Sequence, residues 1–268
     1  LRYFLLREMA FGLDANFSEE ALVGRLNADL ANNLGNLLQR TLGMVGRYLD
    51  GGIPPVGEAA TEGDRELQRA AKTLHGRVAA AMEGFAFHKA LEAIWELLDA
   101  ANRYIDAQKP WELAKRDGPA LARVLGFTCE ALRLVGLHLS PFMPPTAEKI
   151  WARLGIAGSV ADARLSEAGR WGGVPLGIAR QGEALFPRVE TGAAAPPHGA
   201  TGKNETAASS DEITIEEFRR LDLRVGARAI GDLQAVFLAL QGEDRLAAVG
   251  RAEHRMVGLV HSQRRHGD

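Results

Sequence analysis

The chain has 268 residues, of which 46% are hydrophobic and 25% are charged, an ordinary globular composition. No stretch approaches the roughly 20 consecutive apolar residues of a membrane span, which argues against a membrane protein. The formal net charge of -2 argues against a strongly basic nucleic-acid-binding domain, so any RNA contact must come from a local patch or from individual side chains.

The first segment, LRYFLLREMAFG, has neither an initiator Met nor the charged-then-apolar order of a signal peptide. We therefore expect the chain to be a fragment, in which residues 1–17 form the connection from a preceding domain. Three apolar side chains would have packed on that domain and are expected to be exposed here, namely Phe4, Leu5 and Phe11.

Residues 18–155 carry apolar side chains at helical spacing, interrupted by short breaks. Ser18 can cap the first helix, which is expected to run to Leu49, where an Asp-Gly-Gly turn and two prolines stop it. Its apolar stripe consists of Leu22, Leu26, Leu30, Leu34, Leu37, Leu38, Leu42, Val45 and Leu49. Further helices are expected over residues 61–83, 86–107, 110–116, 118–139 and 146–154. Because no segment here alternates as a strand does, the pattern predicts an all-α helical bundle.

Several side chains in these helices have an ordinary structural interpretation. Trp95 and Trp151 lie in phase with apolar neighbours and are expected in the core. Cys129, the only cysteine, also lies among apolar residues and is expected to be a buried hydrophobe. A single cysteine excludes an internal disulfide framework and fits a reducing cytosol. The acids of the DREL and SEEAL segments are expected on outward helix faces.

The sequence changes character after the bundle. Residues 156–190 are Gly-rich and irregular, and Trp171, Leu185 and Phe186 are available to anchor them onto the bundle as a strap. Residues 191–211 lack hydrophobic anchors, which predicts a flexible linker.

No catalytic constellation stands out in the residues. The seven histidines are scattered, without metal-ligand spacing. No Gly-rich phosphate loop follows a strand, and no Gly-x-Ser-x-Gly elbow is present. The residues alone therefore predict a helical domain with a tethered tail and no catalytic or metal site.

Three stretches in one order resemble the methionyl-tRNA synthetase family: LRYFLLREMAFGLDANFSEEAL, ALEAIWELLDAANRYIDAQKPWELAK and GEALFPRVE. The resemblance covers residues 1 to about 190. It implies that residues 18–155 form the anticodon-binding bundle of a class I synthetase and that residues 1–17 leave the catalytic domain. The two ATP-handling signatures of the family would lie upstream of residue 1, so we expect this fragment to lack the aminoacylation site and to be inactive by itself.

A fourth stretch, EITIEEFRRLDLRVG, resembles the start of the oligonucleotide-binding barrel that many bacterial members append for dimerisation and tRNA contact. The likeness ends at Gly226, and the remaining 42 residues are too few for a five-stranded barrel. We therefore expect residues 212–268 to be a truncated or frame-altered tRNA-binding domain. Re-reading the coding DNA in the other two frames tests this hypothesis. If neither frame contains an Asp-Lys-Leu segment, the result counts against a frame change.

The resemblance implies that the parent enzyme is a cytoplasmic methionine–tRNA ligase. This enzyme is expected to use ATP with Mg, and often to bind Zn in the missing domain. No cofactor is expected in this fragment. The implied partners are the anticodon loop of methionine tRNA and the missing catalytic domain. A homodimer through the C-terminal domain is implied if that domain is intact.

In the family, anticodon reading rests on an Asn and an Arg four residues apart and on a Trp that follows a proline. The matching positions are Asn36 and Arg40 in GNLLQR and Trp111 in QKPWELAK. Residues at i and i+4 share a helix face, so Asn36 and Arg40 can converge on one unpaired base, the cytosine that begins the anticodon. Trp111 can stack on that base, a contact worth about 1–3 kcal/mol.

Each of these residues also has an ordinary interpretation. Asn36 alone is typical of a solvent-facing helix position, and Arg40 of a surface charge paired with a carboxylate. Trp111 alone fits a buried core aromatic as well as an exposed stacking platform. Asn102 and Tyr104 are expected to be helix-packing polar groups that brace the segment around Trp111.

Two alternatives stay open at this point. The chain could be a stand-alone tRNA-binding or assembly module without a catalytic partner, which an upstream reading frame for a nucleotide-binding half would exclude. It could also be the related bundle of a synthetase for leucine, isoleucine, valine or cysteine. The combination of NLLQR with KPW argues against the latter.

Overall fold

The structure is a computed structural model that describes residues 1–12 and 17–189. The expected linker at 191–211 and the expected truncated domain at 212–268 lie outside the described residues. Within these ranges the regular secondary structure is helical, apart from an isolated antiparallel bridge between Gly52 and Ile178. The predicted all-α bundle is therefore confirmed for the described part of the chain.

The helices follow in the order α1 (Arg2–Glu8), α2 (Glu19–Arg25), the π-helix η1 (Leu26–Gly35), α3 (Asn36–Tyr48), α4 (Glu62–Glu83), α5 (Phe87–Gln108), α6 (Pro110–Leu113), α7 (Gly118–Leu139), α8 (Pro144–Arg153), the 3₁₀-helix η2 (Val160–Asp162) and α9 (Leu165–Ala168). Among the described helices, none is both long enough and apolar enough to cross a membrane.

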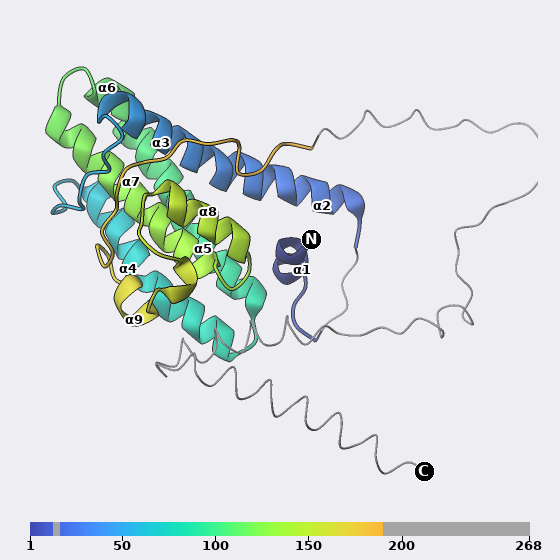
Figure 1. Ribbon diagram of the computed structural model, residues 1–268. Helices are drawn as coiled ribbons and strands as arrows, with labels where there is room; N and C mark the ends of the chain where they lie inside the picture. The colour runs from blue at the N-terminus through green and yellow to red at the C-terminus, as the bar shows by residue number, and fades with distance from the viewer. Residues whose placement is uncertain (13–16, 190–268) are drawn as a thin grey trace, which may run out of the picture.

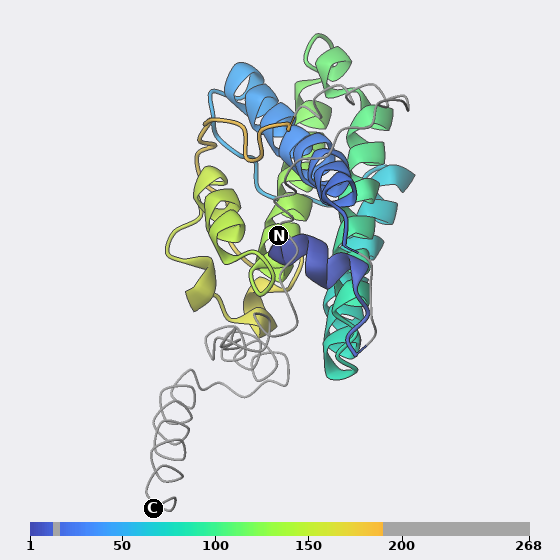
Figure 2. The ribbon, with the colours of Figure 1, turned by 90° about the vertical axis from the view of Figure 1, so that its right-hand side faces the viewer.

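The long helices α4, α5 and α7 pack against one another, and α2, η1 and α3 form one continuous rod beside them (Figure 1). The most central helix is α7, which is buried at every position from Val124 to Leu139. The view turned by 90° shows α8 beside α7 on the side away from α4 and α5 (Figure 2). Trp95, Trp151 and Cys129 are all buried, as predicted, and burial raises the pKa of the Cys129 thiol.

The α2–η1–α3 rod begins and ends where the sequence predicts. The Ser18 hydroxyl accepts a hydrogen bond from the Ala21 N–H at 3.1 Å, which is an N-cap contact. At the far end, Asp50 and Gly51 take positive φ angles of 51° and 83°, which stop the helix.

The middle of the rod differs from the prediction, because η1 is π-helical. The leucines at 22, 26, 30 and 34 recur every four residues, which is longer than the 3.6-residue α-helical repeat. An underwound helix keeps leucines at this spacing closer to one line along the helix than an α-helix does.

The expectation of outward-facing acids is wrong for Asp64, which is fully buried at the start of α4. The Thr61 hydroxyl accepts a hydrogen bond from the Asp64 N–H, and the Asp64 carboxylate accepts one from the Thr61 N–H at 2.8 Å, forming a capping box. The Tyr104 hydroxyl donates to the same carboxylate at 2.7 Å, and Arg123 lies 3.0 Å from it. Tyr104 is therefore a packing group, as predicted, but it braces α4 instead of the segment around Trp111.

Two short helices have different bounds from those predicted. Helix α6 ends at Leu113 instead of residue 116, because the following turn leads to Asp117, whose side chain caps α7 by accepting from the Ala120 N–H at 2.9 Å. Helix α8 begins at Pro144, two residues early, since proline is well suited to the first turn of a helix.

The N-terminal segment contradicts one expectation. Phe4 is only 2% exposed, because α1 packs on α5 and the Phe4 ring meets the Phe17 ring edge-on at 5.7 Å. Leu5 is half-buried, whereas Phe11 is 70% exposed, as expected. Helix α1 is thus part of the bundle.

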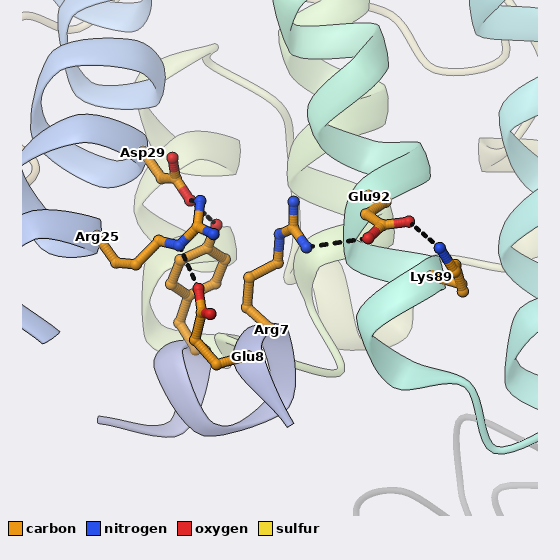
Figure 3. A network of polar contacts seen from close by, with 7 residues as sticks. Arg7, Glu8, Arg25, Asp29, Lys89 and Glu92 are labelled. Carbon is orange, nitrogen blue, oxygen red and sulfur yellow. Dashed lines mark hydrogen bonds and ion pairs between the residues drawn. The ribbon is translucent and has the colours of Figure 1, made fainter. Parts of the chain in front are cut away.

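Ion pairs also fix α1 to its neighbours (Figure 3). The Arg25 guanidinium lies between Glu8 of α1 and Asp29 of η1, while Arg7 pairs with Glu92 of α5 at 3.2 Å. The helix is therefore tied both to the rod and to the centre of the bundle.

The strap packs on the bundle through the three predicted anchors. Leu185 lies in the core, Trp171 meets Phe127 edge-on at 5.2 Å, and Phe186 packs against the core beside Gly35. The expected strap is confirmed as far as residue 189.

A buried ion pair on α7 holds the middle of the strap. Glu130 and Arg133 are both fully buried, with N–O distances of 2.6 and 2.8 Å between them. The Arg133 guanidinium also donates to the backbone carbonyls of Ala168 and Arg170, and Glu130 accepts from the Gly172 N–H at 2.6 Å. The charges thus satisfy strap backbone groups that would otherwise be buried without partners.

Candidate nucleic-acid interface

Two of the predicted site residues lie at the start of α3. Asn36 is its first residue and is exposed, and Arg40, one turn further on, is half-buried. The neighbouring Leu37 and Leu38 are fully buried, so the core fixes the rotation of this helix. Asn36 and Arg40 share the face that points away from those leucines.

The third predicted residue, Trp111, lies in α6 and is 39% exposed. Lys109, between α5 and α6, takes the left-handed conformation with φ 48° and ψ 61°, which is unusual for a residue with a side chain. Pro110 follows at the first helical position and is buried. The buried proline and the turn before it therefore place the indole at the surface, outside the hydrophobic interior.

An ion pair brings these two parts together. Arg40 Nη1 lies 2.9 Å from Asp106 Oδ1 on the last turn of α5, five residues before Trp111. Both views place α6 at the end of the bundle where α3 ends (Figures 1 and 2). Asp106 was not identified from the sequence. The available signal was an acidic residue one turn before the end of a helix, a position where it can pair with a basic residue of a neighbouring helix.

A polar depression of about 340 Å³ adjoins this site between η1 and α5, lined by Ala28, Asn32, Asn33, Asp99, Asn102 and Arg103. Asn33 donates to Asp99 at 2.7 Å and accepts from Asn102 at 2.6 Å. Asn102 also donates to the Leu98 carbonyl. Its predicted role in bracing the segment around Trp111 is therefore wrong, because its hydrogen bonds join α5 to η1.

Cationic side chains flank Trp111 in the sequence. Lys115 and Arg116 are exposed just after α6, and Lys109 precedes it. Glu112 lies 3.4 Å from Lys109 and 3.8 Å from Arg116, so one acid faces two of these cations. The segment keeps an excess of positive charge, which suits contact with phosphate.

The arrangement is suited to binding. Within residues 1–12 and 17–189, no cluster of three or more His, Cys, Asp or Glu side chains could hold a metal ion. What the site offers is a partly exposed indole, hydrogen-bond donors on a helix joined to α5 by the Arg40–Asp106 pair, and cations beside Trp111 in the sequence, a combination that suits an unpaired RNA base.

Comparison with known proteins gives two family matches. Residues 64–181 match the family model of the anticodon-binding domain of tRNA ligase. Residues 1–42 match that of the class I (M) tRNA synthetases.

Individual proteins agree with these matches. The chain is 40% identical over 232 residues to the methionine–tRNA ligase of Caldanaerobacter subterraneus and 39% identical over 239 residues to methionine–tRNA ligase 1 of Bacillus anthracis. Each match covers 84% of this chain and 36% of the relative. Methionyl-tRNA synthetase of Mycobacterium tuberculosis, solved with methionyl-adenylate, superimposes with a TM-score of 0.64 at 42% identity, covering 70% of this chain and 37% of that one.

The helical bundle is thus an anticodon-binding domain of the tRNA-ligase type. The chain belongs to the methionyl-tRNA synthetase family, and it spans about a third of the length of the curated relatives that it matches. Membership of this family argues against the alternative that the chain is the bundle of a synthetase for leucine, isoleucine, valine or cysteine. The role of Asn36, Arg40 and Trp111 in binding RNA stays a prediction.

Proposed function

We propose that this chain binds the anticodon loop of methionine tRNA and supplies anticodon recognition to a methionine–tRNA ligase, which attaches methionine to tRNA with ATP. The observation that carries the proposal is the Arg40–Asp106 ion pair, which joins the helix of Asn36 and Arg40 to the segment that presents the half-exposed Trp111.

The first anticodon base, a cytosine, would stack on the indole. Stacking needs an accessible aromatic ring, and the 39% exposure of Trp111 supports this role. Asn36 and Arg40 would donate to the acceptors on the edge of the base, since both side chains carry N–H donors on one helix face. Because Asp106 already holds one Arg40 nitrogen, the guanidinium is oriented before RNA arrives, which lowers the entropy lost on binding.

The other parts of the activity belong to the part of the relatives that this chain does not span. There we place the sites for ATP, Mg and methionine, and often Zn. We propose that the chain's protein partner is that catalytic half, and that a second copy joins through the C-terminal domain where that domain is intact.

The decisive experiment measures binding of an anticodon stem-loop to the chain by fluorescence anisotropy. Trp111→Ala should weaken binding at least about tenfold, the loss expected for one base–aromatic stack. The control is Phe17→Ala, which removes another exposed ring from the far end of the rod. Unchanged affinity in Trp111→Ala, with the helix content intact by circular dichroism, would remove Trp111 from the site.

A further inference from the structure

The π-helix η1 ends where the candidate site begins. The Asn36 N–H donates to the Ala31 carbonyl, five residues back, so the first site residue closes the last π turn. At Gly35, a Cβ atom would lie 3.0 Å from the Leu30 carbonyl oxygen, which leaves little room for a side chain. Most π segments are single turns, so ten consecutive residues in this form need support from outside the helix.

The first support is Asn27, which holds the end of the strap. Its side-chain N–H donates to the Val189 carbonyl at 2.8 Å, and its side-chain oxygen accepts from the Val189 N–H at 3.0 Å. Both halves of the amide are used on one backbone residue, so the contact fixes direction as well as distance.

The second support is Asp29, which is joined to α1. The Tyr3 hydroxyl donates to Asp29 at 2.6 Å, and the Arg25 guanidinium lies 3.3 Å from the same oxygen (Figure 3). Burial, together with the bond to Asp29, raises the pKa of the Tyr3 hydroxyl, which therefore stays a donor. The Tyr3 ring packs on Trp95 of α5 with centroids 4.7 Å apart, so the hydroxyl has little freedom to move away.

The third support is Asn33, which is joined to α5. Its amide donates to Asp99 and accepts from Asn102, as described above. Three polar side chains of one π-helix are thus hydrogen-bonded to three different elements: the strap, α1 and α5.

We propose that Asn27, Asp29 and Asn33 hold η1 in the π form and thereby set the rotational position of Asn36 and Arg40 relative to α5, which leads to Trp111. A π turn contains more residues than an α turn, so any return of η1 toward α-helical winding would rotate the start of α3 against α5. The three side chains are positioning residues for base recognition, and this half of the inference rests on the proposed function.

Not every support gives a clean test. Asn33 lines the polar depression, so its replacement could remove a direct RNA contact. Tyr3 and Asn27, by contrast, are bonded to Asp29 and to the strap, and neither lines that depression. If substitution of Tyr3 or Asn27 changes the base preference, the effect must therefore be transmitted through η1.

The experiment uses the full 268-residue chain with Tyr3→Phe and Asn27→Ala, singly and together. Two quantities are measured: amide hydrogen exchange over residues 31–36 in the free protein, and the ratio of stem-loop affinities with cytosine and with uridine as the first anticodon base. Tyr104→Phe is the matched control, since it removes a buried hydroxyl bond to Asp64 on another face of α5.

In the double variant, exchange over 31–36 should rise at least about tenfold and the cytosine preference should fall at least about threefold, as expected for the loss of three hydrogen bonds. The control should lower the thermal midpoint without changing either quantity. The single variants, which remove fewer bonds, provide the same comparison if the double variant does not fold.

Unchanged exchange in these variants would show that the contacts do not hold η1, and the proposal would be overturned. Faster exchange with an unchanged cytosine preference would overturn the positioning role. If the wild-type chain showed no preference at all, the proposed function would fail together with the positioning role, while the exchange measurement would still decide whether the contacts hold η1.

Discussion

The imidazole rings of His75 on α4 and His138 on α7 lie with their centroids 5.8 Å apart. His138 is buried, and its Nδ1 lies 2.9 Å from the Leu134 carbonyl oxygen. Burial lowers the pKa of His138 to about 4, and it also lowers the pKa of His75. Both rings are therefore neutral in the folded protein at neutral pH.

This pair predicts a loss of stability in mild acid. The unfolded chain binds a proton at each histidine near pH 6.5, whereas folded His138 does not until about pH 4. The free energy of unfolding should therefore fall as the pH drops from 6.5 to 4, by roughly 3 kcal/mol from His138 alone, and should keep its full value above pH 6.5. Urea unfolding at pH 7.5 and pH 5 measures the difference. His138→Gln should reduce it, and an equal difference in that variant would refute the assignment.

The buried Arg133–Glu130 pair predicts a non-additive mutant cycle. Arg133→Met should destabilise the protein by about 3–5 kcal/mol, because it leaves the Glu130 carboxylate buried without its partner. Arg133→Met combined with Glu130→Gln should cost less than Arg133→Met alone, since no uncompensated charge remains. Chemical denaturation gives both values. A double variant less stable than the single one would show that the strap contacts outweigh the buried charge.

Arg40 should contribute more to discrimination between bases at the first anticodon position than to the overall affinity for the stem-loop. Arg40→Ala should weaken binding of a stem-loop that begins its anticodon with cytosine more than binding of one with another base there. The Arg40–Asp106 pair is partly exposed and contributes at most about 1 kcal/mol to folding, so the thermal midpoint should change little. An equal loss of affinity for both stem-loops would identify Arg40 as a phosphate contact.

Gly155, at the base of the strap, should tolerate a side chain less well than Gly158. It has φ 65°, and a Cβ there would lie 2.5 Å from the backbone N and O of Ile178. Gly158 has a similar φ of 77° but open space around it. Gly158→Ala should therefore cost about 1–2 kcal/mol from backbone strain alone, and Gly155→Ala distinctly more. Equal losses in thermal unfolding would mean that the strap can move aside.

Features encoded within a few residues could be predicted from the sequence. The Ser18 cap, the stop at Asp50 and Gly51, and the turn at Pro110 depend on local backbone chemistry, and the structure has each of them. The strap anchors were also predicted, because large apolar residues in an irregular Gly-rich segment are buried most readily against the neighbouring bundle.

Features that depend on partners distant in sequence were missed. Asp64 has the surface-type side chain of a first helical turn, and two of its partners, Tyr104 and Arg123, lie at least forty residues later in the sequence. Phe4 was expected to be exposed because it was assigned to a contact with a preceding domain, and the seven residues of α1 carry no pattern that predicts packing on α5. The candidate site was proposed through family resemblance, and Asp106, which orients Arg40, was not part of it.

The double hydrogen bond between Asn27 and Val189 has a further consequence for the path of the chain. Asn27 lies two residues from Asp29, which holds Tyr3, so the first helix and the end of the strap are both fastened to the same two turns of η1. Figure 1 shows both of these segments at the opposite end of the rod from α6. Tyr3 of α1 and Val189 of the strap are thus held by the same two turns of η1, at the end of the rod away from α6.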